Sequence, residues 1–192
     1  MDSPLPPSVI SSAIAAGQIR EYLRAVLTMR IGGRSEPPAG FNWFGHEQLL
    51  LEFAADWTPA VKPKRLAWAT PRFCFCNSHT LCARSDRYVY CEGYCLPDFP
   101  GGFPFPVHHG WAVDRETGLV VDVTLREPAL CYVGMAFAPT YRKLWWGKNS
   151  GNDNCSLFEG VSELLRLHRV EIGSILWYPP SSPTHPGAVN EA

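Results

Sequence analysis

The stretch that decides the fold is CFCNSHTLCARSDRYVYCEGYCLPDFPGGFPFPVHHGWAVDRETGLVVDVTL, residues 74–125. Its start, CFCNSHTLCARS, predicts a short helix that opens near Cys74 to Cys76. Three segments with the composition of strands follow at 88–96, 107–113 and 119–125. The turn signal DRETG separates the last two segments, so we expect them to be antiparallel neighbours. The pattern predicts an α+β fold in which an antiparallel sheet packs against this helix.

Three reactive side chains occur in this stretch in the order cysteine, histidine, aspartate. Cys74 stands at the start of the predicted helix, His109 on the second strand and Asp122 on the third. A helix N-terminus or a neighbouring imidazolium lowers the pKa of a thiol and makes it nucleophilic. A carboxylate on the adjacent strand can fix the tautomer of the imidazole. The order therefore predicts a nucleophile, a general base and an orienting group.

The predicted turn favours His109 over His108 as the base. A turn centred near residue 116 pairs positions whose numbers sum to about 231, as those of His109 and Asp122 do. We therefore expect these two side chains to lie directly opposite each other on one face of the sheet. His108 then points to the other face, because side chains alternate along a strand.

Four short motifs carry a resemblance to a known family. They are Cys74-Phe75-x-Asn77-Ser78-x-x-Leu81, Tyr90-x-Glu92-Gly93-Tyr94, His109-Gly110-Trp111 and Val121-Asp122-x-Thr124. In this order they resemble the transglutaminase-like branch of the papain-like cysteine hydrolase superfamily, over residues 70–137. The resemblance implies that Cys74 is the nucleophile, that His109 is the general base and acid, and that Asp122 orients His109. It also implies acyl transfer or amide hydrolysis through a thioester, with no cofactor.

Two departures from the family pattern leave alternatives open. Cys76 also stands at the helix start and is an alternative nucleophile, and no glutamine precedes Cys74 as an oxyanion donor. Backbone N–H groups at the helix start would then hold the oxyanion, with Asn77 or Gln48 as a second donor. Glu92 is a candidate for binding a cationic substrate group, or for pairing with an arginine, Arg72 or Arg87.

The flanking sequence predicts further elements around these motifs. Apolar residues at helical spacing predict helices over 8–29, 46–57 and 158–169. Segments 129–137 and 173–178 are predicted strands, and 142–154 is a predicted loop with two tryptophans. We expect residues 1–178 to form a single catalytic domain and the proline-rich tail 179–192 to be disordered.

Composition argues against several classes of protein. Seventeen Lys and Arg against eighteen Asp and Glu give a net charge of −1, so we expect neither a nucleic-acid partner nor an anionic membrane. No apolar run approaches the roughly 18 to 20 residues that cross a bilayer, and the N-terminus lacks the pattern of a secretory signal. Five of the seven cysteines lie between Cys74 and Cys95, and we expect reduced thiols and a cytoplasmic location.

The expected function is therefore a cysteine-dependent amide or ester hydrolase, or an acyltransferase, acting on a small-molecule, peptide or protein acyl donor. Two alternatives belong to other classes. One is a zinc-binding module, of which only Cys91-x3-Cys95 has the usual ligand spacing; the other is an inactive relative that acts as a binding protein. The zinc ligands would come from Cys74, Cys76, Cys91, Cys95 and the His108–His109 pair.

Overall fold

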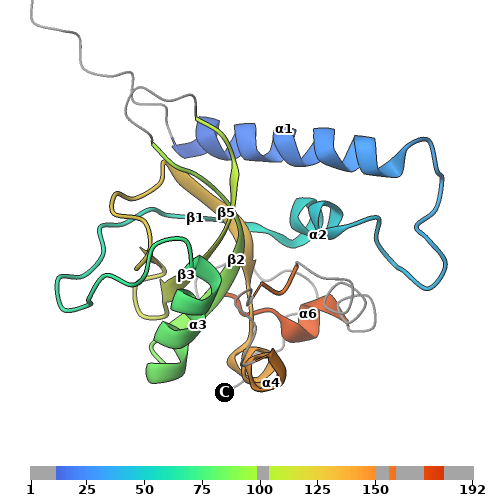
Figure 1. Cartoon of the computed structure of the whole chain (residues 1–192). Helices are drawn as coiled ribbons and strands as arrows, with labels where there is room; N and C mark the ends of the chain where they lie inside the picture. Colours follow the sequence, from blue (N-terminus) through green and yellow to red (C-terminus); the bar gives the residue numbers. More distant parts are fainter. Residues whose placement is uncertain (1–11, 99–103, 150–155, 159–170, 180–192) are drawn as a thin grey trace, which may run out of the picture.

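One antiparallel sheet forms the centre of the protein (Figure 1). The computed structural model describes residues 12–98, 104–149, 156–158 and 171–179. The sheet has the strand order β1-β5-β2-β3-β4, and helices pack around it, which confirms the α+β prediction. Its strands are β1 (Ala55–Trp57), β2 (Tyr88–Leu96), β3 (Val107–Asp114), β4 (Val120–Val121) and β5 (Cys131–Ala136). The helices are α1 (Ser12–Ile31), α2 (His46–Phe53), α3 (Cys74–Arg84), α4 (Pro139–Asn149) and α6 (Ile172–Ile175).

The elements that carry the motifs lie where the sequence predicts them. The predicted helix 74–85 is α3, and the predicted strands 88–96 and 107–113 are β2 and β3. Strand 129–137 is β5, slightly shorter than predicted, and helix 8–29 is α1 within the described residues.

Two predicted elements end earlier than expected. The helix predicted over 46–57 stops at Phe53, because Ala54 is extended and residues 55–57 pair with β5 as the edge strand β1. The strand predicted over 119–125 contains only residues 120 and 121. Its remainder folds into a turn because the Asp122 carboxylate accepts the N–H groups of Thr124 and Leu125, which then cannot join a strand ladder.

Two predictions for the C-terminal part of the chain, the loop 142–154 and the strand 173–178, differ from the structure. Residues 142–149 of the predicted loop belong to helix α4, which begins with a proline at a position where proline is favoured. The buried Arg142 ties α4 to the carbonyls of His79 and Cys82 on α3. Segment 173–178 forms the short helix α6 and a single bridge, Phe137 to Leu176, in place of a strand. The predicted helix 158–169 and tail 179–192 lie outside the described residues, apart from Phe158 and Pro179.

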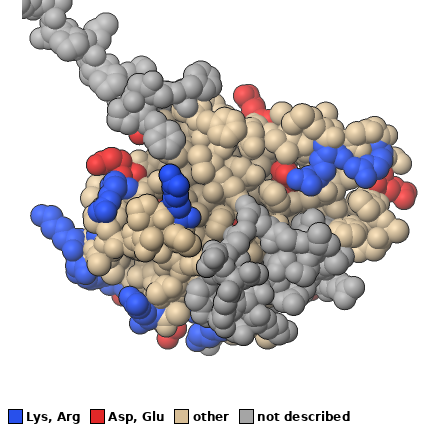
Figure 2. Space-filling model, viewed as in Figure 1, with Lys and Arg blue, Asp and Glu red and all other residues tan. Residues whose placement is uncertain are grey.

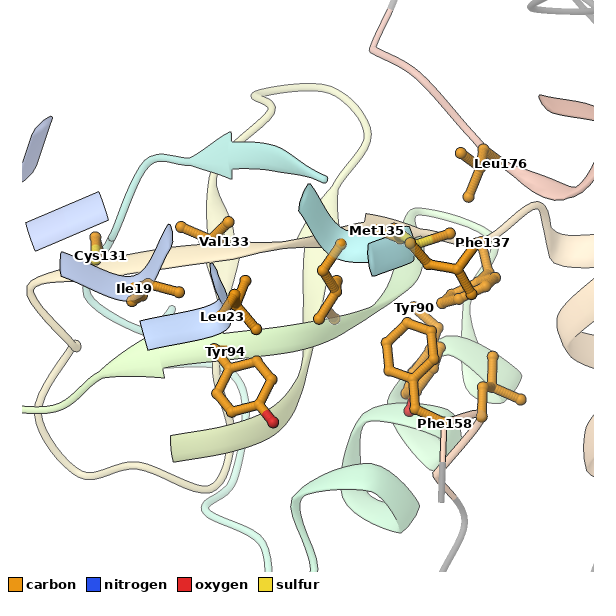
Figure 3. Packing of buried hydrophobic residues seen from close by; sticks show 14 of the residues in the cluster. Ile19, Leu23, Tyr90, Tyr94, Cys131, Val133, Met135, Phe137, Phe158 and Leu176 are labelled. Carbon is orange, nitrogen blue, oxygen red and sulfur yellow. The ribbon is translucent and has the colours of Figure 1, made fainter. Parts of the chain in front are cut away.

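Each face of the sheet has its own core, because side chains alternate along the strands. On one face, Ile19 and Leu23 of α1 pack against Tyr94 and Val133 (Figure 3). This core continues to α2 and to residues 157, 158 and 172–176. The core of the opposite face contains Trp57, Val89, Cys91, Cys95, Trp111, Val113 and Tyr132. Among the described residues, no helix has both the length and the apolar character that crossing a bilayer requires.

Candidate active site

The start of α3 docks against a free stretch of the β3 edge. Strand β4 pairs only with Ala112 and Val113, so β3 has no strand partner on that side at Gly110. The helix supplies the missing partners: the Ser78 hydroxyl donates to the Gly110 carbonyl at 2.9 Å, and the Gly110 N–H bonds the Cys74 sulfur. Helix α3 therefore covers the open edge and brings Cys74 next to His109.

Gly110 also permits the close approach of helix and strand. A Cβ atom at this position would lie 2.8 Å from the Phe75 ring and 3.1 Å from the Phe75 Cα. The structure therefore requires a glycine in the His-Gly-Trp motif, because any side chain there would push the helix away from the strand.

Cys74 occupies the first turn of α3 and is 9% exposed. The chain enters the helix through a turn at Pro71 and Arg72, and Arg72 has φ 71°, in the left-handed region. Burial alone would raise the pKa of the Cys74 thiol. The hydrogen bond and positive charge of His109, with N–H groups of Gly110 and Phe75, outweigh burial and hold that pKa below its ordinary value.

His109 bridges Cys74 and Asp122. Its Nε2 lies 2.7 Å from Asp122 Oδ2, and its side chain also hydrogen bonds the Cys74 sulfur. Burial would lower the pKa of His109, but the Asp122 carboxylate and the Cys74 thiolate raise it to about 10. The raised pKa of His109 and the lowered pKa of Cys74 both favour the thiolate–imidazolium form of the pair.

The strand register differs from the predicted one by two residues. Ala112 pairs with Val121 and Val113 with Val120, so the paired numbers sum to 233. The turn is centred between residues 116 and 117, because the Asp114 N–H bonds the Leu119 carbonyl around the DRETG loop. A shift of two preserves the face of each side chain. His109 and Asp122 therefore share a face, as predicted, but lie diagonally instead of directly opposite.

Four donors hold the Asp122 carboxylate. The N–H groups of Thr124 and Leu125 bind Oδ1 at 2.8 and 3.0 Å, and His109 and the Tyr132 hydroxyl bind Oδ2 at 2.7 and 3.1 Å. Burial would raise the pKa of Asp122, but His109 and the two backbone donors hold it below its ordinary value. The carboxylate is therefore ionised and fixed in position, as an orienting group must be.

Sequence reasoning missed Tyr132. Its hydroxyl accepts the Ala129 N–H at 3.3 Å, so the hydroxyl proton is directed to Asp122. Tyr132 lies on β5, which β2 and β3 separate from β4 in the sheet order, and its register beside Cys95 of β2 brings it to the site. Nothing in ALCYVGMAF reveals this, since the contact depends on which strands are neighbours.

Cys76 is disulfide-bonded and has no thiol to offer as a nucleophile. The expectation that all the cysteines are reduced is therefore wrong for Cys76, whereas the other described cysteines are free thiols. Two residues along a helix correspond to a rotation of about 200°, so Cys76 also faces away from the side that presents Cys74. Of the two candidate nucleophiles, only Cys74 contacts His109.

Asn77, one of the two proposed second oxyanion donors, is engaged elsewhere. The Asn77 amide group donates to the Thr70 carbonyl at 2.7 Å and to the Thr124 hydroxyl at 3.0 Å, which uses both of its hydrogens. Asn77 thus ties the entry turn of α3 to the loop after Asp122 and is not available to an oxyanion. Gln48 accepts the Phe44 N–H through its side-chain oxygen.

Glu92 is a buried structural carboxylate, not an open substrate site. It is 0% exposed and accepts hydrogen bonds from the Tyr90 and Ser156 hydroxyls and from the Leu157 and Phe158 N–H groups. Its ionic partner is His108, at 3.1 Å, and neither Arg72 nor Arg87. Burial would raise the pKa of Glu92, but His108 and the other donors hold it below its ordinary value. His108 points away from the Cys74 site, as predicted.

No group of three or more His, Cys, Asp and Glu side chains within the described ranges is arranged to hold a metal ion. The zinc alternative thus has no site in the part of the chain that the structure covers. Comparison of the chain with protein-family models, with curated proteins and with solved structures finds no match.

Proposed function

We propose that this protein is a cysteine-dependent acyl-transfer enzyme that hydrolyses or transfers the acyl group of an amide or ester through a thioester on Cys74. The observation that carries the proposal is the continuous hydrogen-bonded chain from Cys74 through His109 to Asp122. The helix start, the strand and the order of the three residues resemble those of the papain-like and transglutaminase-like cysteine hydrolases, and we extend the proposal to that fold. A buried but oriented ion pair of this kind is a typical means of activating a thiol.

In the proposed reaction the Cys74 thiolate attacks the carbonyl carbon of the acyl donor and forms a tetrahedral oxyanion. The oxyanion collapses to the thioester as the His109 imidazolium gives its proton to the leaving amine or alcohol. Neutral His109 then takes a proton from water or from an acceptor amine, which attacks the thioester. The second tetrahedral intermediate then breaks its C–S bond and expels the Cys74 thiolate while the proton stays on His109, so the ion pair is restored. Asp122 stays ionised and keeps His109 oriented throughout.

The first oxyanion donor in this proposal is the backbone N–H of Cys74. The N–H groups of Phe75 and Gly110 are directed to the sulfur, so they stabilise the thiolate before attack. The Cys74 N–H lies in the first turn of α3, where backbone N–H groups have no partner within the helix. The helix dipole adds to its effect on developing negative charge.

The first test is brief, limiting alkylation with iodoacetamide at about pH 6, followed by peptide mapping. An ordinary thiol is almost wholly protonated there and reacts slowly. We expect one rapid modification, at Cys74, which His109→Gln slows strongly and His108→Gln leaves rapid. His108 is a matched control because it is the adjacent histidine on the opposite face of β3. Slow alkylation of the wild-type thiol, or equal losses in both histidine variants, would contradict the proposal.

The second test asks for the thioester itself. Incubation with p-nitrophenyl acetate should add the mass of one acetyl group to Cys74, and Cys74→Ala should remove that adduct while retaining the fold. A thiolate that alkylates rapidly but forms no acyl adduct would leave an activated thiol without acyl chemistry, and the proposed reaction would be wrong.

Asp122→Asn tests the third member. The substitution keeps the shape of the side chain and removes its charge, so the pKa of His109 falls and the ion pair with Cys74 is weakened. We expect the rate of Cys74 alkylation at about pH 6 to fall by about tenfold or more, the effect of one pKa unit. An unchanged rate would show that Asp122 does not support the His109 charge.

A further inference from the structure

The connection between β1 and α3 carries positive charge up to the nucleophile. Residues 58–73 contain four basic side chains and no acidic one. The last of them, Arg72, stands two residues before Cys74 and is exposed. Figure 2 shows Lys and Arg side chains on the left side of the molecule, where this connection runs in Figure 1. The basic residues are Lys62, Lys64, Arg65 and Arg72.

A second segment that flanks the triad adds a fifth cation. The Ala69 N–H bonds the Val123 carbonyl at 2.9 Å, so the connection lies beside the loop that follows Asp122. The Arg126 guanidinium of that loop lies 5.0 Å from the centre of the Trp68 ring, and Lys62 Nζ lies 4.4 Å from it. The exposed indole thus gathers two cations from two segments and restricts their movement.

The cations of this surface outnumber its carboxylates, because segments 58–73 and 123–130 carry five basic side chains and one acidic one, Glu127. No carboxylate of the described residues pairs with Lys64, Arg72 or Arg126. Elsewhere on the surface an arginine has such partners, as Arg87 has in Asp114 and Glu116. Unpaired cations close to a reactive group raise the local concentration of anions, over about 8 Å at physiological ionic strength. We call Lys62, Lys64, Arg72 and Arg126 the cationic rim.

We propose that the acyl donor is anionic, and that the cationic rim attracts its negative charge to the side of Cys74 formed by residues 62–72 and 126. Two observations support this proposal. A run of basic residues precedes the nucleophile in the sequence, and the loop after Asp122 brings Arg126 onto the Trp68 ring that Lys62 also contacts. The inference rests on the proposed function, because it assigns a substrate class to that site.

Two alkylating reagents of opposite character test the rim without a known substrate. Iodoacetate is an anion and iodoacetamide is neutral, and the same Cys74 thiolate attacks the carbon of each and displaces the same leaving group, iodide. The ratio of their rate constants at Cys74 therefore reports attraction of the anion, separately from any change in the reactivity of the thiol. Arg72→Gln and Arg126→Gln should each lower this ratio by about two- to threefold at physiological ionic strength. High salt should lower the wild-type ratio toward that of the double variant.

The matched control is Arg84→Gln, which removes an exposed cation from the other end of α3. Ten residues of helix place it about 15 Å from Cys74, beyond the screening length. Its ratio should equal that of the wild type. Equal ratios in Arg84→Gln and in the Arg72→Gln/Arg126→Gln double variant would overturn the rim proposal. Slow reaction of wild-type Cys74 with iodoacetamide would overturn the proposed function instead, so the two failures are distinguishable.

Discussion

At the scale of single residues, the charge state of the site depends on how Asp122 is held. Oδ1 accepts two backbone N–H groups, so the carboxylate stays in place even when a donor to Oδ2 is lost. His109 and Tyr132 share Oδ2. The hydroxyl therefore competes with His109 for the same negative charge, and Tyr132 acts on the base only through Asp122.

Tyr132→Phe should consequently raise the pKa of His109, which is about 10 in the wild type, by several tenths of a unit to about one unit. NMR titration of the His109 ring measures this directly. In an Asp122→Asn background the same substitution should have no effect, because the group it acts on is gone. A merely structural role would lower the melting temperature and leave the pKa of His109 unchanged, and that result would contradict a positioning role.

The predictable part of the site is the part that local patterns determine. Cys74 follows from its place at a helix start, and the choice of His109 over His108 follows from strand alternation. The predicted register was wrong by two residues, but the choice of His109 was unaffected, because only a shift by an odd number of residues moves side chains to the other face of the sheet. Tyr132 and the engagement of Asn77 could not be predicted, because each depends on a contact between segments far apart in the sequence.

At the scale of elements, the site depends on the fit between α3 and the edge of β3. Gly110→Ala would place a methyl group 2.8 Å from the Phe75 ring and 3.1 Å from its Cα, so helix and strand would separate. We expect a loss of about 1–3 kcal/mol in the free energy of unfolding, together with slower alkylation of Cys74. Denaturant unfolding and the iodoacetamide rate measure the two effects.

Gly17→Ala on α1 is the control for that prediction, because an added Cβ there has no atom within 4 Å. Alanine should leave stability equal or raise it by up to about 1 kcal/mol. Equal behaviour of the two alanine variants would show that the close approach at Gly110 is not needed.

The ends of helices and strands could be predicted where the local sequence pattern determines them. They could not be predicted where contacts with distant parts of the chain determine them. Helix α3 and strand β2 match their predicted ranges closely. The strand predicted over 119–125 fails after Val121 because Asp122 captures the next N–H groups itself. Helix α4 replaces a predicted loop, and the hydrogen bonds of its buried Arg142 to α3 are a tertiary contact that local composition does not show.

At the scale of the whole molecule, Glu92 joins parts of the chain that no local pattern connects. Strand β2 supplies the carboxylate, β3 supplies His108, and the segment 156–158 supplies a hydroxyl and two N–H groups. The His108 ring also stacks on His46 of α2 with centres 5.5 Å apart. The strand order likewise could not be predicted beyond the β3–β4 hairpin, since β5 pairs with β2 and β1 pairs with β5 across long separations.

Glu92→Gln should therefore destabilise the whole protein. It keeps the shape but removes the charge that five donors surround, and we expect the free energy of unfolding at about pH 7 to fall by about 2–4 kcal/mol. Glu52→Gln, at an exposed position on α2, should change stability by less than about 0.5 kcal/mol. Denaturant unfolding measures both.

The pH dependence of that loss identifies its cause. The pKa of Glu92 is lower in the folded protein than its ordinary value of 4.5, so its stabilisation is present above about pH 4.5 and is lost as the pH falls through the folded-state pKa. The difference in stability between wild type and Glu92→Gln should therefore shrink in acid. Cys74 should keep its rapid alkylation in the folded variant, because Glu92 faces away from the triad. Slow alkylation with unchanged stability would instead give Glu92 the substrate role that its place in the sequence suggested.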